Sequence, residues 1–330
     1  MDENQDRASR EESSAPVSTA PARDLICRDR VGIGFVAPGD LAEAAALDRT
    51  PGVDSLWVGG HIASRNPSPE PMAWLAGLAA VTERAVVGSA VVTLPLYPPA
   101  LVAKQIADTD NASGGRVALG IGVGGEYPQE FAACHVPTKG RGARTDEAVG
   151  LLRAFWTGEP VTHDGPVFPV SDVRVHPAPA QPGGPPVLVA GRGDAAMARA
   201  ARLGDGWMPY MYSPRRYRNS VGTIRALADE VGRDLSGFGW LAYIPVCVDD
   251  DEDTALRETA AFLGGTYQQD FTELARHIAA AGTVDRVAER LAAYVDAGAR
   301  HLVLLPTRRG DDTITRVLAE VAPRLRGMSG

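Results

Sequence analysis

Glycine recurs at every second position in the segment VALGIGVGGE, at Gly120, Gly122 and Gly124. Successive side chains of an extended chain point to opposite faces, so these glycines would leave one face of a strand as bare backbone. Because glycine weakens the interior of a strand, its repeated use indicates close approach by a ligand or by another backbone. The spacing therefore predicts a flat ligand against this face, with a bulge or a cramped barrel interior as the equal alternative.

Two side chains that can exchange protons follow candidate strands. His61 comes after the apolar run 55–58 and a pair of glycines, and an imidazole there can give or take a proton near neutral pH. Glu126 follows Gly124 and Gly125, where a carboxylate beside an apolar ligand can act as an acid or a base. We expect both residues to be catalytic. The alternatives are a loop histidine bonded to backbone and a carboxylate that caps the next helix.

The segment VLVAGRGDAAMAR has the pattern of a strand, a short glycine loop and the start of a helix. Free N–H groups at a helix N-terminus and the helix dipole favour a phosphate, and glycines let an anion approach the backbone. We therefore expect a phosphate site at Ala190, Gly191, Arg192 and Gly193, with Arg192 adding a charge-assisted contact. The alternative is an ordinary turn in which Asp194 is the N-cap residue.

The glycines also fit Gly-x-Gly-x-x-Gly through Gly120, Gly122 and Gly125, a pattern of Rossmann-type dinucleotide-binding folds. That fold needs a helix that opens at the third glycine and an acidic residue about twenty positions later, at the end of the next strand. Here Tyr127 and Pro128 follow instead. A nicotinamide dehydrogenase of this type is a distant alternative.

Size and composition limit the class of protein. A chain of 330 residues with 45% hydrophobic content fits one barrel-type domain, since such barrels have about 250 residues or more. The net charge of −8 argues against nucleic-acid and membrane partners, and neither a membrane span nor a signal segment is evident. The three cysteines are far apart, without metal-ligand spacing. We expect a cytoplasmic protein with reduced thiols, no metal site and a small-molecule substrate.

The elements that must position these residues alternate along the chain. Residues 1–24 are poor in large apolar residues and predict a disordered tail, which leaves 25–330 as one domain. Beyond it, short apolar runs alternate with amphipathic segments, as in a parallel sheet with crossover helices. Eight expected strands predict a closed barrel. They are 31–36, 55–58, 85–94, 116–123, 187–190, 206–209, 241–246 and 301–305.

Helical spacing is clearest at 99–112, 144–156, 194–203, 214–231 and 283–297. The stretch 157–186 is rich in proline and glycine, so it is not an ordinary crossover helix. We expect an insertion there, either a lid or binding loop, or a structural arm or dimer contact.

Four segments together resemble the bacterial luciferase-like oxidoreductases: PPALVAKQIADTD, RVALGIGVG, RGARTDE and AARLGDGW. Their order is collinear with that family over roughly residues 31–324. The resemblance implies a TIM-type (β/α)8 barrel with insertions that binds FMN or the deazaflavin coenzyme F420 at its C-terminal mouth. It also implies that the flat ligand at the glycines is the ring of that cofactor.

Positions carried over from the family give the cofactor-binding residues, with a non-prolyl cis peptide expected between Ala90 and Val91. They are Ala90, Val91, Thr93, Gly122, Val123, Gly124, Gly125, Ala190, Gly191, Arg192 and Gly193. His61 matches a histidine that several deazaflavin-using members place beside the reacting carbon. Those members have aspartate before it and tryptophan four residues after it, where this chain has Gly60 and Arg65. This difference argues against a sugar-phosphate dehydrogenase.

The resemblance thus implies an oxidoreductase acting on a small organic substrate, either a monooxygenase with reduced FMN or a hydride-transfer enzyme with F420. The cofactor decides the reaction, because a 5-deazaflavin does not form the peroxide adduct that oxygen insertion requires. A catalytically silent flavin-binding protein of the same fold is the alternative. The family also implies a homodimer and a separate flavin or F420 reductase as a partner.

Overall fold

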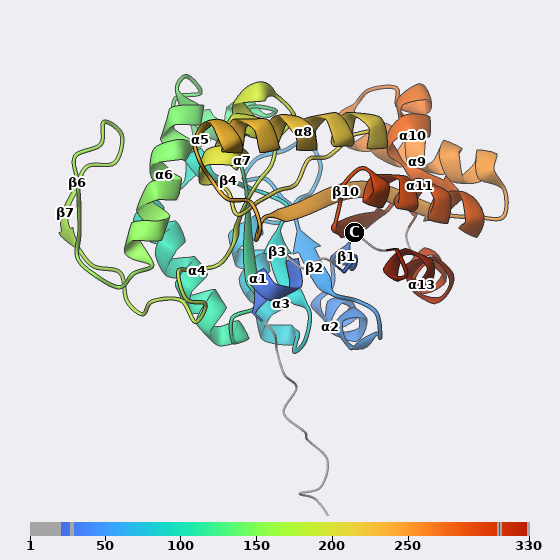
Figure 1. Ribbon diagram of the computed structural model, residues 1–330, viewed down its shortest axis with the longest axis horizontal. Coiled ribbons are helices and arrows are strands. Elements are labelled where there is room, and N and C mark those ends of the chain that lie inside the picture. Colours follow the sequence, from blue (N-terminus) through green and yellow to red (C-terminus); the bar gives the residue numbers. More distant parts are fainter. Residues whose placement is uncertain (1–20, 27–29, 309, 311, 329–330) are drawn as a thin grey trace, which may run out of the picture.

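The computed structural model describes residues 21–26, 30–308, 310 and 312–328. Within them a ring of parallel strands is surrounded by helices (Figure 1). The ring runs in the order β1, β2, β3, β5, β8, β9, β10, β12 and closes back on β1. Its strands are β1 (Gly32–Val36), β2 (Ser55–Val58), β3 (Val86–Ser89), β5 (Val117–Gly122), β8 (Val187–Val189), β9 (Gly206–Trp207), β10 (Gly239–Val248) and β12 (His301–Pro306). The expected TIM-type barrel is confirmed.

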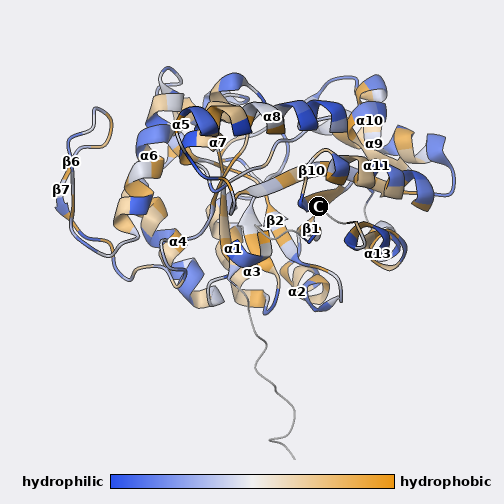
Figure 2. Ribbon diagram, viewed as in Figure 1, coloured by the Kyte–Doolittle hydropathy of each residue, from blue (hydrophilic) through white to orange (hydrophobic). Residues whose placement is uncertain are grey.

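Helices cover the outside of the ring, with mainly apolar strands at the centre of the molecule (Figure 2). They are α2 (Leu41–Arg49), α3 (Pro71–Val81), α4 (Pro99–Ser113), α5 (Pro128–Ala133), α6 (Arg141–Phe155), α7 (Asp194–Leu203), α8 (Pro214–Glu230), α9 (Glu252–Tyr267), α10 (Thr272–Ile278), α11 (Val284–Asp296), α12 (Thr313–Arg316) and α13 (Ala322–Arg326). Among the described residues, no helix combines the length and apolar character that a membrane crossing requires.

Helix α11 illustrates how the sequence specifies these elements. The side chain of its N-cap residue Thr283 accepts a hydrogen bond from the backbone N–H of Arg286, which satisfies one of the free donors of the first turn. Val284, Val287 and Leu291 recur at helical spacing and are buried. This apolar stripe packs the helix against the barrel.

The start of the described chain corrects the expected tail. Residues 1–20 lie outside the described residues, but α1 (Ala22–Ile26) is helical, and both Ala22 and Ile26 are buried. They pack against Trp57, Val86 and other residues inside the barrel. The backbone N–H of Ala22 also donates to the Gly115 carbonyl, just before β5. Helix α1 therefore covers the end of the barrel at which the strands begin.

The third expected strand is interrupted. Strand β3 ends at Ser89, the Ala90–Val91 peptide is cis as the family resemblance implied, and β4 (Val92–Thr93) then pairs with β5. The Ala90 N–H donates to the carbonyl of Val58 at the end of β2. The interruption places residues 90 and 91 at the C-terminal mouth of the barrel.

The three alternating glycines do not share one bare strand face, so that prediction is wrong in part. A side chain at Gly120 would clash with the Ser89 carbonyl of the neighbouring strand, which is the cramped interior given as the alternative. Strand β5 ends at Gly122, and Gly124 and Gly125 have left-handed backbone angles, with φ of 63° and 112°. The bare backbone at the mouth is therefore the segment 122–125.

The insertion at 157–186 holds the antiparallel pair β6 (Val161–His163) and β7 (Val170–Val173), which projects beside α6 (Figure 1). It is tied to α6 by Glu147, whose carboxylate lies 3.2 Å from His163 Nε2 and accepts a 2.7 Å bond from the Phe168 N–H. This geometry is that of a structural arm, and the cavity described below is lined by other parts of the chain.

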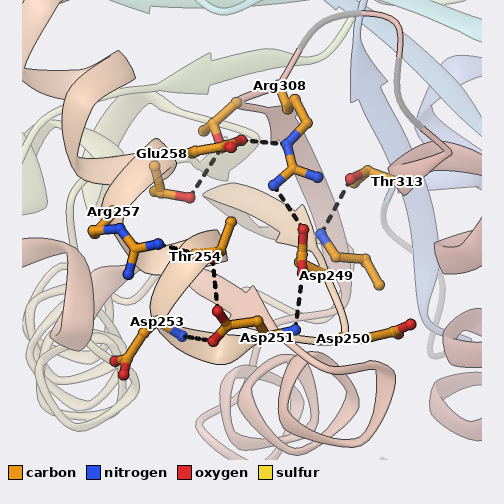
Figure 3. Close-up of polar contacts among 12 residues, drawn as sticks. Asp249, Asp250, Asp251, Asp253, Thr254, Arg257, Glu258, Arg308 and Thr313 are labelled. Carbon is orange, nitrogen blue, oxygen red and sulfur yellow. Dashed lines mark hydrogen bonds and ion pairs between the residues drawn. The ribbon is translucent and has the colours of Figure 1, made fainter.

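A polar cluster joins the C-terminal ends of β10 and β12 (Figure 3). Arg308, after β12, donates to Asp249 at 2.9 Å and pairs with Glu258 of α9. Asp251 is the N-cap of α9 and accepts bonds from Asp253 N–H and the Thr254 hydroxyl. The bonds to Glu258 and then Asp249 raise the pKa of Arg308. This cluster fixes α9, which ends at the mouth of the barrel.

Candidate active site

A cavity of about 300 Å³ lies at the C-terminal mouth of the barrel. It collects residues that follow β2, β3, β5 and β8, as expected for a barrel in which strand ends carry function. Both expected catalytic residues, His61 and Glu126, line it. So do nine of the expected cofactor-binding residues, Ala90, Val91, Thr93, Gly122, Val123, Gly124, Gly125, Ala190 and Gly191. Arg192 and Gly193 come next in the chain and are absent from the lining.

One wall of the cavity is built of backbone after β5. A Cβ added at Gly122 would lie 3.0 Å from Val91 Cγ2, and one at Gly124 would clash with Thr93 Cγ2. A Cβ at Gly125 would lie 3.2 Å from the Arg141 guanidinium carbon. Side chains at these positions would press on these neighbours, so glycine lets the backbone pack closely here and form the wall itself. A planar ring fits such a surface.

The N-terminus of α7 is open to an anion. Its N-cap residue is Gly193, which has no side chain, and Asp194 is the first helical residue. The alternative in which Asp194 caps the turn is therefore wrong. The N–H groups of Ala196 and Met197 bond to the Gly193 carbonyl, while in the described residues no bond is found for the N–H groups of 193–195. Free donors at a helix N-terminus suit a phosphate.

Two arginines lie beside this wall and this helix. The Arg192 guanidinium stacks over the Tyr210 ring, 4.9 Å from its centroid. Arg141, the first residue of α6, lies against Gly125, and its buried Nε finds no hydrogen-bond partner among the described residues. A buried donor left without a partner is costly unless a ligand group meets it. Arg141 belongs to the segment RGARTDE, yet it was not among the site residues predicted from the sequence.

His61 is paired with a buried carboxylate. Its Nδ1 lies 3.3 Å from Glu130 of α5, which also accepts a 2.7 Å bond from the Ile62 N–H. The edge of the ring meets Tyr127, with ring centroids 4.6 Å apart. The ring is therefore not simply bonded to backbone, the alternative considered from the sequence. Glu130 was not predicted, although its spacing of four from Glu126 places both near the start of one helix.

Glu126 is exposed at the mouth of the cavity. The N-cap residue of α5 is Tyr127, and that cap has no side-chain hydrogen bond. Glu126 therefore does not cap this helix, which was the other interpretation of its position. Its carboxylate is free to meet a ligand from the solvent side.

The remaining walls are aromatic and apolar, from Met208, Tyr210, Tyr243 and Tyr267. Burial raises the pKa of Tyr210, Tyr243 and Tyr267, so their hydroxyl groups stay neutral at physiological pH. Tyr210 follows β9. The others come from β10 and the end of α9, and nothing in their local sequence marks them.

The charged residues that line the described part of the cavity are both acidic, Glu126 and Glu130, and His61 is paired with Glu130. No lysine or arginine is among the described residues of the lining. Arg141 lies instead behind the glycine wall, and Arg192 lies just before the N-terminus of α7.

Comparisons with known proteins agree with this geometry. The family model for luciferase-like monooxygenases matches residues 34–301. An F420-dependent glucose-6-phosphate dehydrogenase of Kineococcus radiotolerans is 31% identical over 323 residues, which cover 88% of this chain and 94% of the relative.

Solved structures share the fold at low identity. An F420-dependent secondary alcohol dehydrogenase in complex with an F420–acetone adduct superposes with a TM-score of 0.79 at 21% identity, covering 90% of this chain and 99% of that one. The oxygenating constituent of 3,6-diketocamphane monooxygenase from Pseudomonas putida, in complex with FMN, gives 0.69 at 19% identity, covering 89% and 98%.

Proposed function

Since the chain belongs to the luciferase-like monooxygenase family and is a flavin- or deazaflavin-dependent oxidoreductase, we propose that its cofactor is F420 and its reaction a hydride transfer. The substrate is a small neutral alcohol, or the corresponding carbonyl compound. The observation that carries this proposal is the cavity itself, in which a flat glycine wall, an open helix N-terminus and the His61–Glu130 pair meet.

The choice of F420 rests on the relatives and on the fit of the site. Relatives that match along 88% of the chain are named as F420-dependent. The ring would lie against Val91 and the segment 122–125, and the phosphate would meet Gly191 to Gly193 and the N-terminus of α7. Arg141 would donate its unpartnered Nε–H to an oxygen of the same cofactor. Bound F420 supplies a carbon centre that accepts or donates a hydride.

His61 is the proposed proton-transfer residue. It lines the cavity, and its Nε2 has no hydrogen bond to any described residue. An imidazole nitrogen facing a bound alcohol can take the hydroxyl proton as the hydride leaves. Glu126, at the open side, is the alternative acid or base. The tyrosines and Met208 exclude water from the reacting atoms.

A neutral substrate is proposed because no lysine or arginine of the described residues lines the cavity. The exposed carboxylate of Glu126 faces the mouth, while Glu130 is buried beside His61, and a sugar phosphate would meet the like charge of Glu126 there. The chain also has Gly60 and Arg65 where deazaflavin-using relatives are expected to carry aspartate and tryptophan. Activity on glucose 6-phosphate is therefore not proposed, despite the names of the relatives.

Binding and turnover test this function separately. The purified protein is titrated with FMN and with F420, each oxidised and reduced, by absorbance and fluorescence. We expect F420 to bind more tightly than FMN, and F420 to be reduced with neutral secondary alcohols but not with glucose 6-phosphate. Preferential binding of reduced FMN with oxygen consumption would replace the proposal with a monooxygenase. Tight binding without turnover on any substrate would favour the silent binding protein.

The proposed assembly is a homodimer in the cytoplasm, in keeping with the family expectation. A separate reductase is proposed as a partner that regenerates the reduced cofactor. Light scattering of the purified protein tests the dimer, and a monomeric mass at working concentration would contradict it.

A further inference from the structure

We propose that Glu130 is the positioning residue of this site, and that it fixes His61 as the Nδ1–H tautomer with Nε2 directed at the substrate. The inference rests on the proton-transfer role proposed for His61. It concerns a residue of α5 that contacts His61 and not the substrate.

The hydrogen bonds around Glu130 define the tautomer. Its Oε1 accepts from the backbone N–H groups of Ile62 at 2.7 Å and Ala63 at 3.3 Å, and its Oε2 lies 3.3 Å from His61 Nδ1. An ionised carboxylate only accepts hydrogen bonds, so Nδ1 must carry the proton. In neutral imidazole, Nε2 then holds a lone pair. That lone pair is the base that a hydroxyl group in the cavity needs.

Glu130 and His61 differ in burial, and therefore in role. The side chain of Glu130 is 2% exposed, while that of His61 is 31% exposed. A buried carboxylate is unfavourable unless donors surround it, and here the donors are two backbone N–H groups and the imidazole. Glu130 is thus held in place by the 62–63 backbone, and it holds the ring in turn.

Among the described groups around His61 and Glu130, Glu130 is the one that accepts a hydrogen bond from the His61 ring. Burial raises the pKa of Tyr97 and Cys134, and the charge of Glu130 adds to both effects. The Tyr97 hydroxyl donates to Glu70 at 2.6 Å, so it is already engaged. On the cavity side, Glu126, Tyr127 and the exposed Arg65 complete the charged and titratable surroundings.

The proposed proton transfer to His61 balances with hydride transfer to the cofactor. In alcohol oxidation the O–H proton passes to His61 Nε2, the C–H hydride passes to oxidised F420, and the C–O single bond becomes a carbonyl. The ring is then an imidazolium, and Glu130 faces its Nδ1–H. Such a carboxylate acts through orientation and charge without itself taking the proton, as in serine hydrolases.

Replacing Glu130 by glutamine tests the inference with little change of shape. The amide oxygen satisfies the two backbone N–H groups, so the amide NH2 faces Nδ1 and donates to it. His61 is then driven into the Nε2–H tautomer, which cannot take a proton from the substrate. A residue that merely held the 62–63 loop would leave the tautomer unchanged in Glu130→Gln.

Side-chain ¹⁵N NMR of His61, assigned with His61→Asn, is the first readout, at a pH where the ring is neutral. We expect the Nδ1–H form in the wild type and the Nε2–H form in Glu130→Gln. The matched control is Glu147→Gln, which alters the similar pair with His163 at the arm and leaves the tautomer of His61 and the turnover unchanged.

Kinetics give the second readout. In Glu130→Gln the kcat of F420-coupled alcohol oxidation should fall about 10- to 100-fold, with the KM and the Kd for F420 within about twofold of wild type. An Nε2–H tautomer in the wild type, or an unchanged tautomer or kcat in the variant, would overturn the inference. If the wild type does not turn over with F420, the proposed function fails, and the NMR result alone still decides the role of Glu130.

Discussion

Single residues shape this site as much by lacking side chains as by carrying them. The wall after β5 is flat because positions 122, 124 and 125 are glycines, each with a neighbour where a Cβ would stand. In the same cavity, His61 and Glu126 supply the groups that can exchange protons. Recognition of the ring and movement of the proton are therefore separable by substitution.

Gly122→Val should weaken cofactor binding without unfolding the barrel. Gly122 lies at the end of β5 in ordinary extended backbone, and a Cβ there would already be 3.0 Å from Val91 Cγ2. The added side chain would occupy the ring face, and we expect the Kd for F420 to rise by about tenfold or more, equivalent to about 1.4 kcal/mol. Fluorescence titration measures it. Gly150→Ala on α6, where a Cβ meets nothing, is the control, and equal affinities in the two variants would contradict this role.

Arg141→Met should reduce affinity for the anionic cofactor rather than stability. The guanidinium has one hydrogen bond, of 3.3 Å to the Thr138 carbonyl, and a buried Nε without a partner among the described residues. Hydrogen bonds to charged groups contribute about 1.5–3 kcal/mol, so we expect the Kd for F420 to rise about tenfold or more. Arg218→Met on the exposed face of α8 is the control. A lowered melting temperature with unchanged affinity would show that Arg141 is structural.

Among single residues, those that follow strands could be predicted from the sequence, whereas those that helices bring to the site could not. His61 and Glu126 come three and four residues after the ends of β2 and β5, so the rule that function gathers at strand ends found them. Glu130 and Tyr267 reach the same cavity from α5 and the end of α9, and Arg141 of α6 lies behind its glycine wall. The positions of these residues depend on how the helices pack, and the spacing of residues within one segment does not predict that packing.

At the scale of elements, the strands were predictable because each is an apolar run bounded by loop residues. Strand 55–58 was placed correctly, whereas the expected strand 85–94 breaks at the cis peptide Ala90–Val91. Helix α1 was missed because it is a single short turn at the end of a polar segment, and the pair β6 and β7 because proline and glycine hide its pattern. In each case a contact distant in sequence decides the structure.

Asp205, just before β9, is predicted to stabilise the end of the barrel opposite the site. It accepts 2.9 Å bonds from Arg153 and from the Val187 N–H, and it lies 3.4 Å from Arg23 of α1. Burial alone would raise the pKa of Asp205, but the charge of Arg153, the Val187 bond and the charge of Arg23 together lower it. Asp205→Asn should therefore reduce the free energy of unfolding at pH 7, by about 2 kcal/mol.

The pH dependence of that loss has a defined sign. Because the pKa of Asp205 is lower in the folded than in the unfolded state, its stabilisation is present above the unfolded value of about 3.9 and is lost as pH falls through the folded pKa. Urea unfolding of both proteins should show a difference that shrinks below about pH 4. Asp108→Asn, which alters an exposed pair with Lys104, should change little. A difference that grows on acidification would contradict the account.

For the whole molecule, the fold and the site residues carry different information about function. Its (β/α)8 barrel and its family establish a flavin- or deazaflavin-dependent oxidoreductase, while the choice of cofactor and substrate depends on the few residues at the mouth. The cluster of Arg308 with Asp249 and Glu258 and the cover provided by α1 stabilise opposite ends of the barrel. The mouth holds an aromatic and acidic cavity, for which a neutral substrate is proposed.

The most direct test of this account is cofactor-coupled turnover by the wild-type protein with F420 and a panel of neutral secondary alcohols, with glucose 6-phosphate and reduced FMN plus oxygen as comparisons. We predict reduction of F420 by at least one neutral alcohol, no reaction with glucose 6-phosphate, and no oxygen consumption with reduced FMN. Oxygen-dependent turnover with FMN, or F420 reduction by the sugar phosphate alone, would contradict the central claim.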